Sequence, residues 1–222
     1  MIRKNVLKSI AMAMTLGGVS LSAPLVQAAT NVVTCDPTDG LTSSVAVNPA
    51  MVNNASPDAK IGLALKTQWD GCVANAAQLA AWVPSKNGTD NGALIQMADI
   101  QLKAKGFGTC NFAAPTPAAY AASGTIKVKW LDGAGKTVGG VKPSSVAVRV
   151  SGDLATVSAK ATGIVTKGLG IGADFSILAG FDLANPVNGP VLACNTGPYA
   201  GPPVEEIALI TAANSVLSID FP

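Results

Sequence analysis

Apolar and polar residues alternate strictly along several stretches of this sequence. In Ala98–Lys105 every even-numbered position is apolar and every odd-numbered position is polar. Because successive side chains of a β-strand point to opposite faces, this period of two predicts strands with one buried and one solvated face. The pattern recurs cleanly at Thr125–Trp130, Ser145–Val150 and Ala155–Thr162, and less regularly at Ile61–Trp69, Ile171–Ala179 and Val216–Phe221.

Residues typical of turns separate these stretches. Asp132-Gly133 and Gly139-Gly140 bound one loop, and Ser151–Asp153 is predicted to be a short hairpin connection. Five prolines predict a long irregular loop over Asn185–Pro203, and only the Ala-rich segment Cys72–Trp82 suits a short helix. The sequence therefore predicts an all-β protein, an antiparallel β-sandwich or a partly open barrel, with at most one short helix.

The first 28 residues have the pattern of a Sec signal peptide. Three basic residues in the first eight precede the apolar run Ile10–Leu21, and Val26–Ala28 places small residues where a signal peptidase cleaves. We expect cleavage after Ala28 or, as the second choice, after Ala29; the alternative is an N-terminal membrane anchor. The prediction is an exported protein that is periplasmic, cell-surface or extracellular. Residues 29–222 would form a single all-β domain, with a soft internal boundary near 113–122 as the alternative.

Removal of this leader changes the charge balance. The whole sequence has 15 basic and 13 acidic residues, and three of the basic residues lie in the leader. The mature chain would therefore be nearly neutral, so its net charge gives no reason to expect nucleic acid or an anionic membrane as a partner.

Four cysteines, Cys35, Cys72, Cys110 and Cys194, lie beyond the leader. Export would place them in an oxidising compartment, and their even number favours two disulfides. Three connectivities are open, of which Cys72–Cys110 together with Cys35–Cys194 is the first choice. A metal site or a redox pair is the alternative, but the sequence has no Cys-x-x-Cys spacing.

Several segments share a pattern with one group of bacterial proteins. These segments are Gly106–Cys110, Ser123–Trp130, Gly163–Gly168, Gly172-Ala173, Cys194 and Ile219–Phe221. In them the chain resembles small secreted all-β proteins of unknown function that carry paired cysteines. The resemblance implies an all-β fold and export, and it supplies no catalytic residue.

Few residues suit catalysis. The sequence contains no histidine, the most common general base and a frequent metal ligand. Gly135–Thr137 imitates the end of a phosphate-binding loop, whereas Asn87–Gly92 and Asp36–Asp39 offer oxygen atoms to a cation, but all three are predicted to be turns. Glu205 and Glu206 are adjacent, so on a strand they would face opposite sides. We therefore predict no catalytic, cofactor-binding or metal-binding residue, and no cofactor.

Two further sets of residues have a structural and a functional interpretation. Trp69 and Trp130 continue the apolar sides of their strands and are predicted in the core, whereas Trp82 is the best candidate for an exposed aromatic residue. Four lysines would form one basic stripe if their two strands pair, but solvation and protection of a strand edge explain them without any ligand, and this structural interpretation is preferred. These are Lys103, Lys105, Lys127 and Lys129.

The function that fits these observations is an exported, disulfide-stabilised, non-enzymatic surface, matrix or interaction protein. Its partner would be a protein or a glycan at a surface, and a pilin-like subunit that polymerises is one variant. Two alternatives remain: an outer-membrane β-barrel, which alternating strands and a near-terminal Phe221 suggest, and a carbohydrate-binding or hydrolytic module, for which Trp side chains or paired Asp residues would be the site.

Overall fold

The computed structural model describes residues 30–52, 60–75, 94–108, 118–153, 158–190 and 202–221. These residues form eleven strands and one short 3-10 helix, η3 (Pro186–Asn188). The strands are β1 (Thr30–Cys35), β2 (Thr42–Met51), β3 (Lys60–Trp69), β4 (Cys72–Ala74), β5 (Met97–Gly108), β6 (Ala118–Leu131), β7 (Ser144–Asp153), β8 (Ser158–Lys167), β9 (Asp174–Phe181), β10 (Val204–Ile210) and β11 (Val216–Phe221). The all-β prediction is confirmed. No helix among these residues is long and apolar enough to cross a membrane.

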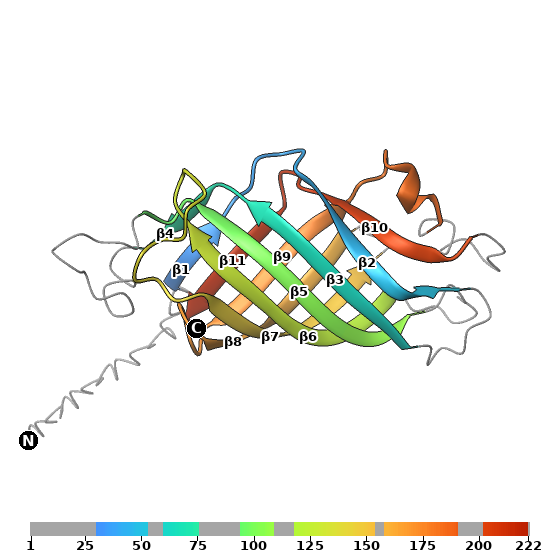
Figure 1. The fold of residues 1–222 in the computed structure, drawn as a ribbon, viewed down its shortest axis with the longest axis horizontal. Coiled ribbons are helices and arrows are strands. Elements are labelled where there is room, and N and C mark those ends of the chain that lie inside the picture. Colours follow the sequence, from blue (N-terminus) through green and yellow to red (C-terminus); the bar gives the residue numbers. More distant parts are fainter. Residues whose placement is uncertain are drawn as a thin grey trace, which may run out of the picture.

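Every strand pairing is antiparallel, and together they make one sheet that curls on itself (Figure 1). The order is β10-β2-β3-β5-β6-β7-β8-β9, and β9 then pairs with β10 through Leu209↔Phe181 and Ile210↔Gly180. Nearer its N-terminal end, β9 pairs with β11 instead. β11 also pairs with β1, and β1 pairs with β4 at the edge of the sheet. The result is an irregular barrel, which agrees with the barrel form of the prediction rather than with two separate sheets.

The first and last strands of the chain form a single seam. β1 pairs with β11 through Cys35↔Leu217, and β2 pairs with β10 through Val45↔Ile207. Between these two ladders, the Thr211 amide donates to the Leu41 carbonyl at 3.0 Å, and the Thr211 hydroxyl donates to the Thr38 carbonyl at 2.6 Å. Hydrogen bonds therefore continue along the seam between the end of one pair of strands and the start of the other.

The predicted alternation decides which side chains fill the barrel. In β5 the buried positions include Ala98, Ile100, Leu102 and Ala104, as the sequence predicts. Trp69 and Trp130 are 2% and 1% exposed, which confirms that both belong to the core. The interior is a close-packed core whose burial stabilises the fold.

Tight curvature of the wall requires glycine at particular positions. Gly163 of β8 lies opposite Val148 of β7, and a Cβ built on Gly163 would lie 1.9 Å from the Ala147 carbonyl oxygen. No side chain fits at this separation, so the two backbones approach each other closely only because residue 163 is glycine.

The disulfide pairing predicted from the sequence is wrong. Cys35 of β1 bonds to Cys72 of β4, its direct cross-strand partner, and both are buried. Since Cys72 begins a strand, the helix predicted from this residue is also wrong over Cys72–Ala74; residues 76–82 lie outside the described part. Cys110 and Cys194 lie outside it as well.

The connections predicted at Ser151–Asp153 and near residues 113–122 differ from those in the fold. Ser151–Asp153 is not the β7–β8 turn but the end of β7, which pairs with β8 as far as Asp153↔Ser158. The segment suggested as a soft boundary enters β6 at Ala118, and its residues to Ala122 pair with β5 and β7.

Candidate binding surface

Lysine and arginine side chains gather on one part of the barrel wall, which we call the basic arc. It comprises the outward positions of five consecutive strands of the ring, β3, β5, β6, β7 and β8. All nine cations on these strands are exposed. They are Lys60, Lys66, Lys103, Lys105, Lys127, Lys129, Arg149, Lys160 and Lys167.

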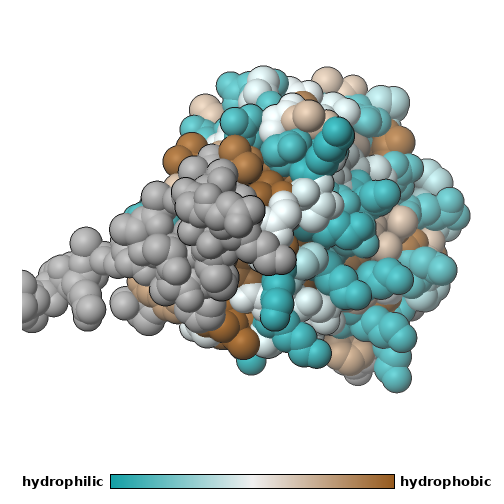
Figure 2. Space-filling model, turned by 60° about the vertical axis from the view of Figure 1, so that its left-hand side comes forward, coloured by the Kyte–Doolittle hydropathy of each residue, from teal (hydrophilic) through white to brown (hydrophobic). Residues whose placement is uncertain are grey.

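The register of the strands produces this arrangement. β5 pairs with β6 through Gln101↔Lys127 and Lys103↔Thr125, so the four lysines singled out in the sequence lie on one face of adjacent strands. Lys66 lies opposite Gln101 on the other side of β5, which extends the row to β3. Figure 2 shows hydrophilic side chains spread over the barrel wall at the right of its view.

Acidic residues gather on the remaining part of the ring, which we call the acidic arc. β9, β10 and β11 carry four of them, and the connections beside β1, β3 and β9 carry the rest. In the described residues of these strands, and of β1, β2 and β4, there is no lysine or arginine. The acidic residues of this arc are Asp174, Asp220, Glu205, Glu206, Asp36, Asp39, Asp70 and Asp182, and the other described acidic residues, Asp99, Asp132 and Asp153, lie on β5, in the β6–β7 connection and on β7.

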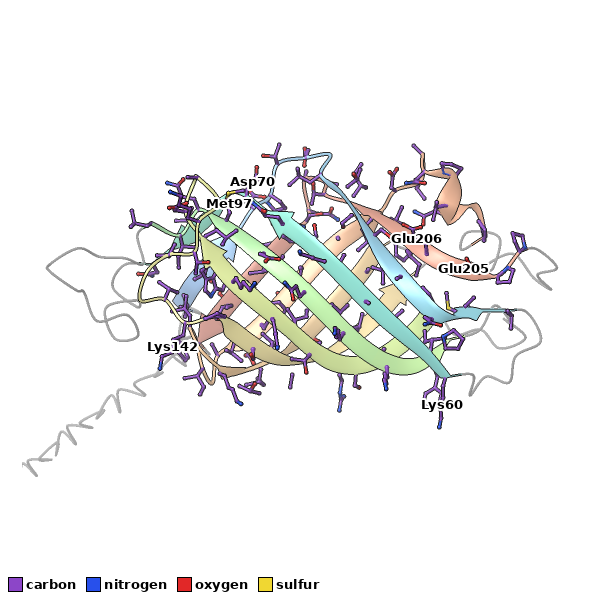
Figure 3. All side chains as sticks on the ribbon, in the orientation of Figure 1. Lys60, Asp70, Met97, Lys142, Glu205 and Glu206 are labelled. Carbon is purple, nitrogen blue, oxygen red and sulfur yellow. A yellow bond between two sulfur atoms is a disulfide. The ribbon has the colours of Figure 1, made fainter. Side chains whose placement is uncertain are left out.

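The centres of the two arcs lie on opposite sides of the barrel. From β6, at the middle of the basic arc, β10 is four strands away in either direction around the ring. Glu205 and Glu206 of β10 are exposed, and Glu206 accepts a hydrogen bond from the Ser44 hydroxyl of β2 (Figure 3).

An open groove crosses the wall where the arcs meet. It has a volume of about 720 Å³ and is lined by side chains of β6, β7, β8, β9 and β11. One cross-strand row contributes four polar side chains to it, Arg149↔Thr162↔Ser176↔Ser218, with the last two hydroxyl oxygens 3.0 Å apart. The groove offers one cation and several hydroxyls to a polar ligand.

Two carboxylates lie side by side at the acidic end of this groove. Asp174 of β9 and Asp220 of β11 are direct cross-strand partners and both line it. Asp220 Oδ1 is buried and has no hydrogen-bond partner among the described residues. Among these residues no three acidic or cysteine side chains come close enough to share a metal ion.

The inside of the barrel offers far less room. The hollow between its walls is about 40 Å³, and Leu65, Trp69 and Ile126 are among the apolar residues that line it. Small-molecule sites usually measure about 300–1,000 Å³. Among the described residues, the larger hollows therefore lie on the outer wall.

An acidic side chain also holds two connections together at one end of the barrel. The Asp70 carboxylate accepts hydrogen bonds from the Thr38 amide and the Thr38 hydroxyl, both at 2.7 Å. The amide bond and then the hydroxyl bond lower the pKa of Asp70 from its usual value, while partial burial acts weakly in the opposite direction. This contact joins the β1–β2 connection to the β3–β4 connection.

The other residues singled out in the sequence do not form a site. Gly135–Thr137 lies in the β6–β7 connection, where the Gly135 amide donates to the Asp132 carbonyl, so its prediction as a turn is confirmed. Asn87–Gly92 and Trp82 lie outside the described residues. Neither arc was predicted from the sequence, although one signal was present: every cation after residue 28 lies between Lys60 and Lys167.

No family model matches the chain, and no curated protein or solved structure matches it.

Proposed function

We propose that this chain is an exported, disulfide-stabilised protein that acts by binding through its outer wall, as a surface or matrix component, and not by catalysis. The observation that carries the proposal is the division of the wall into a basic and an acidic arc around a packed interior. Charge sorted in this way creates fields that orient and attract a partner. The buried Cys35–Cys72 disulfide is compatible with an oxidising, exported location.

Fractionation of the native cells and their medium tests this proposal. The protein is followed by mass spectrometry of its N-terminus and of peptides from non-reducing digests. A mature form that begins near Ala29, found in the medium or released from the surface by salt, supports the proposal. Recovery only from the cytoplasm with the leader intact would overturn it.

The groove between the arcs favours a second candidate, a glycan-binding protein. Ser176, Ser218 and Thr162 provide hydroxyls along its length, and Arg149 and Asp174 provide charges that suit polar sugar groups. A glycan array probed with the wild type and with Arg149→Ala tests this. A glycan bound by the wild type and lost in the variant would support it, whereas no bound glycan would argue against it.

The outer-membrane alternative has less support. Barrels that span a membrane present an outward apolar band with aromatic girdles. Here the outward positions of five consecutive strands carry nine exposed cations, and among their large apolar side chains only Phe107 and Ile164 are exposed in the described residues. Recovery of the protein only in detergent extracts of the outer membrane would reverse this preference.

A further inference from the structure

We infer that copies of this chain associate head to tail, with the basic arc of one copy against the acidic arc of the next. Charge complementarity supports this inference, because the two arcs have opposite signs and occupy opposite sides of one barrel. The partner in the proposed function would then be a second copy of this chain, and the inference rests on that function only for its biological setting. The association itself is a property of the purified protein.

The charges of both arcs are largely unneutralised within the chain. The one ion pair that the described residues make joins Lys129 Nζ to Asp99 Oδ2 at 3.9 Å, within the basic arc. The side chain of Glu206 is bonded to a neutral hydroxyl, and Glu205 is exposed. A second copy would bring cations to these carboxylates, a pairing that the single barrel lacks.

Overall charge does not oppose such contacts. The described residues include eleven cations and eleven acidic residues, so two copies repel each other little at long range. Attraction between facing arcs then depends on local charge, and it weakens when salt screens that charge. The screening length is about 30 Å at 0.01 M salt and only a few ångströms near 1 M.

The position of the arcs determines the kind of assembly. When the basic arc of one copy docks on the acidic arc of another, the resulting pair still has one unoccupied basic arc and one unoccupied acidic arc. Contacts of this heterologous type do not close a dimer but continue into an open chain. We therefore expect chains of variable length and not one defined oligomer.

Sedimentation velocity of the purified mature protein tests this inference. In about 0.01 M salt, the weight-average sedimentation coefficient should rise steadily with protein concentration, and about 0.5 M salt should return it to the monomer value. A monomer at every concentration in low salt would overturn the inference, as would an association that salt does not weaken.

Charge-reversal variants identify the surfaces. Lys103→Glu/Lys127→Glu reverses two exposed positions of the basic arc, and Glu205→Lys/Glu206→Lys reverses two of the acidic arc. For each variant by itself, the sedimentation coefficient should no longer rise with protein concentration, since the substituted patch then has the same sign as the opposite arc. An equimolar mixture should regain association, because the unchanged arc of each variant fits that of the other.

A matched control separates the arcs from net charge. Lys136→Glu/Lys142→Glu makes the same charge change in the β6–β7 connection, and Figure 3 shows Lys142 at the end of the barrel away from Glu205 and Glu206. This variant should retain association. Equal loss in the control, or no recovery in the mixture, would overturn the inference.

Two outcomes would separate this inference from the proposed function. In one outcome the wild type stays monomeric and binds an acidic polysaccharide column, and of the variants only Lys103→Glu/Lys127→Glu loses this retention. The basic arc then binds a partner other than a second copy, so the head-to-tail inference fails while the proposed binding function stands. If the protein is cytoplasmic yet associates as described, the inference stands and the proposed export fails.

Discussion

The indole nitrogen of Trp130 donates a hydrogen bond of 3.1 Å to the hydroxyl oxygen of Ser144 inside the barrel. The Ser144 hydroxyl in turn donates a hydrogen bond of 2.6 Å to the Leu169 carbonyl oxygen. Ser144 has no exposed surface and Trp130 almost none. This relay connects β6, the start of β7 and the β8–β9 connection through a single side chain.

Replacement of Ser144 by alanine should therefore destabilise the protein. The change leaves the Trp130 N–H and the Leu169 carbonyl without a partner in the core, which costs about 1–3 kcal/mol of unfolding free energy. Denaturant unfolding followed by tryptophan fluorescence measures it. Ser145→Ala, one residue along on the outer face, should change stability by less than about 0.5 kcal/mol; equal losses in the two variants would contradict the role of the relay.

Loss of the disulfide should have a larger effect. The bond between Cys35 and Cys72 closes a loop with a sequence separation of 37 residues. Restriction of the unfolded chain by a loop of this length contributes about 3–4 kcal/mol, so Cys35→Ala/Cys72→Ala should unfold at a much lower denaturant concentration. Mass spectrometry of a non-reducing digest should find Cys35 and Cys72 in one linked peptide. A Cys72–Cys110 peptide would contradict this pairing.

Asp70 should make stability depend on pH in the acid range. Its pKa is lowered in the folded protein by hydrogen bonds from Thr38, so its contribution is complete above the unfolded pKa of about 3.9 and disappears as the pH falls through the lower folded value. Asp70→Asn should cost about 1 kcal/mol or less at pH 7, because the carboxylate is mostly solvated.

The difference between wild type and Asp70→Asn should shrink as the pH falls below 4. Urea unfolding from pH 7 to pH 2.5 measures this convergence. Asp39→Asn removes a carboxylate from the same connection without removing a bond to Thr38, and should leave the pH profile of the wild type unchanged. A constant difference across the whole range would show that Asp70 acts through something other than its charge.

Gly163→Ala should disturb the wall of the barrel. The added methyl group would overlap the Ala147 carbonyl oxygen, and the forced separation of β7 and β8 should cost roughly 1–3 kcal/mol. Gly139→Ala is the matched change, because a Cβ at Gly139 meets no atom within 4 Å. Thermal unfolding that ranks the two variants equally would contradict the close approach at Gly163.

The alternation in the sequence was sufficient to predict most strands and their buried faces. Ala98, Ile100 and Leu102 lie on the side that their spacing indicates, because a period of two depends only on local backbone geometry. The partner of a strand depends on distant residues. Cys72 was assigned to an Ala-rich helix on local composition, whereas its backbone is held in a strand by Thr34 and Cys35, nearly forty positions earlier.

The candidate surface was harder to predict for a related reason. Four of its lysines were identified as a stripe that depended on strand pairing, and the pairing of β5 with β6 brings them together. The acidic arc could not be seen, because it combines Glu205 with residues such as Asp36, whose strands join one ring only through the pairing of β2 with β10 and of β1 with β11. The groove likewise takes Arg149 and Asp220 from strands far apart in the chain.

The seam also has a consequence for biosynthesis. Thr30, in the first strand, pairs with Phe221, the last residue of the last strand. β1 and β2 therefore each lack one neighbour, β11 and β10 respectively, until those two strands have been synthesised, and such long-range pairing is slow. A chain released before β10 and β11 would display the open backbone edges of β1, β2 and β9 together, which is the state that holding chaperones exist to shield.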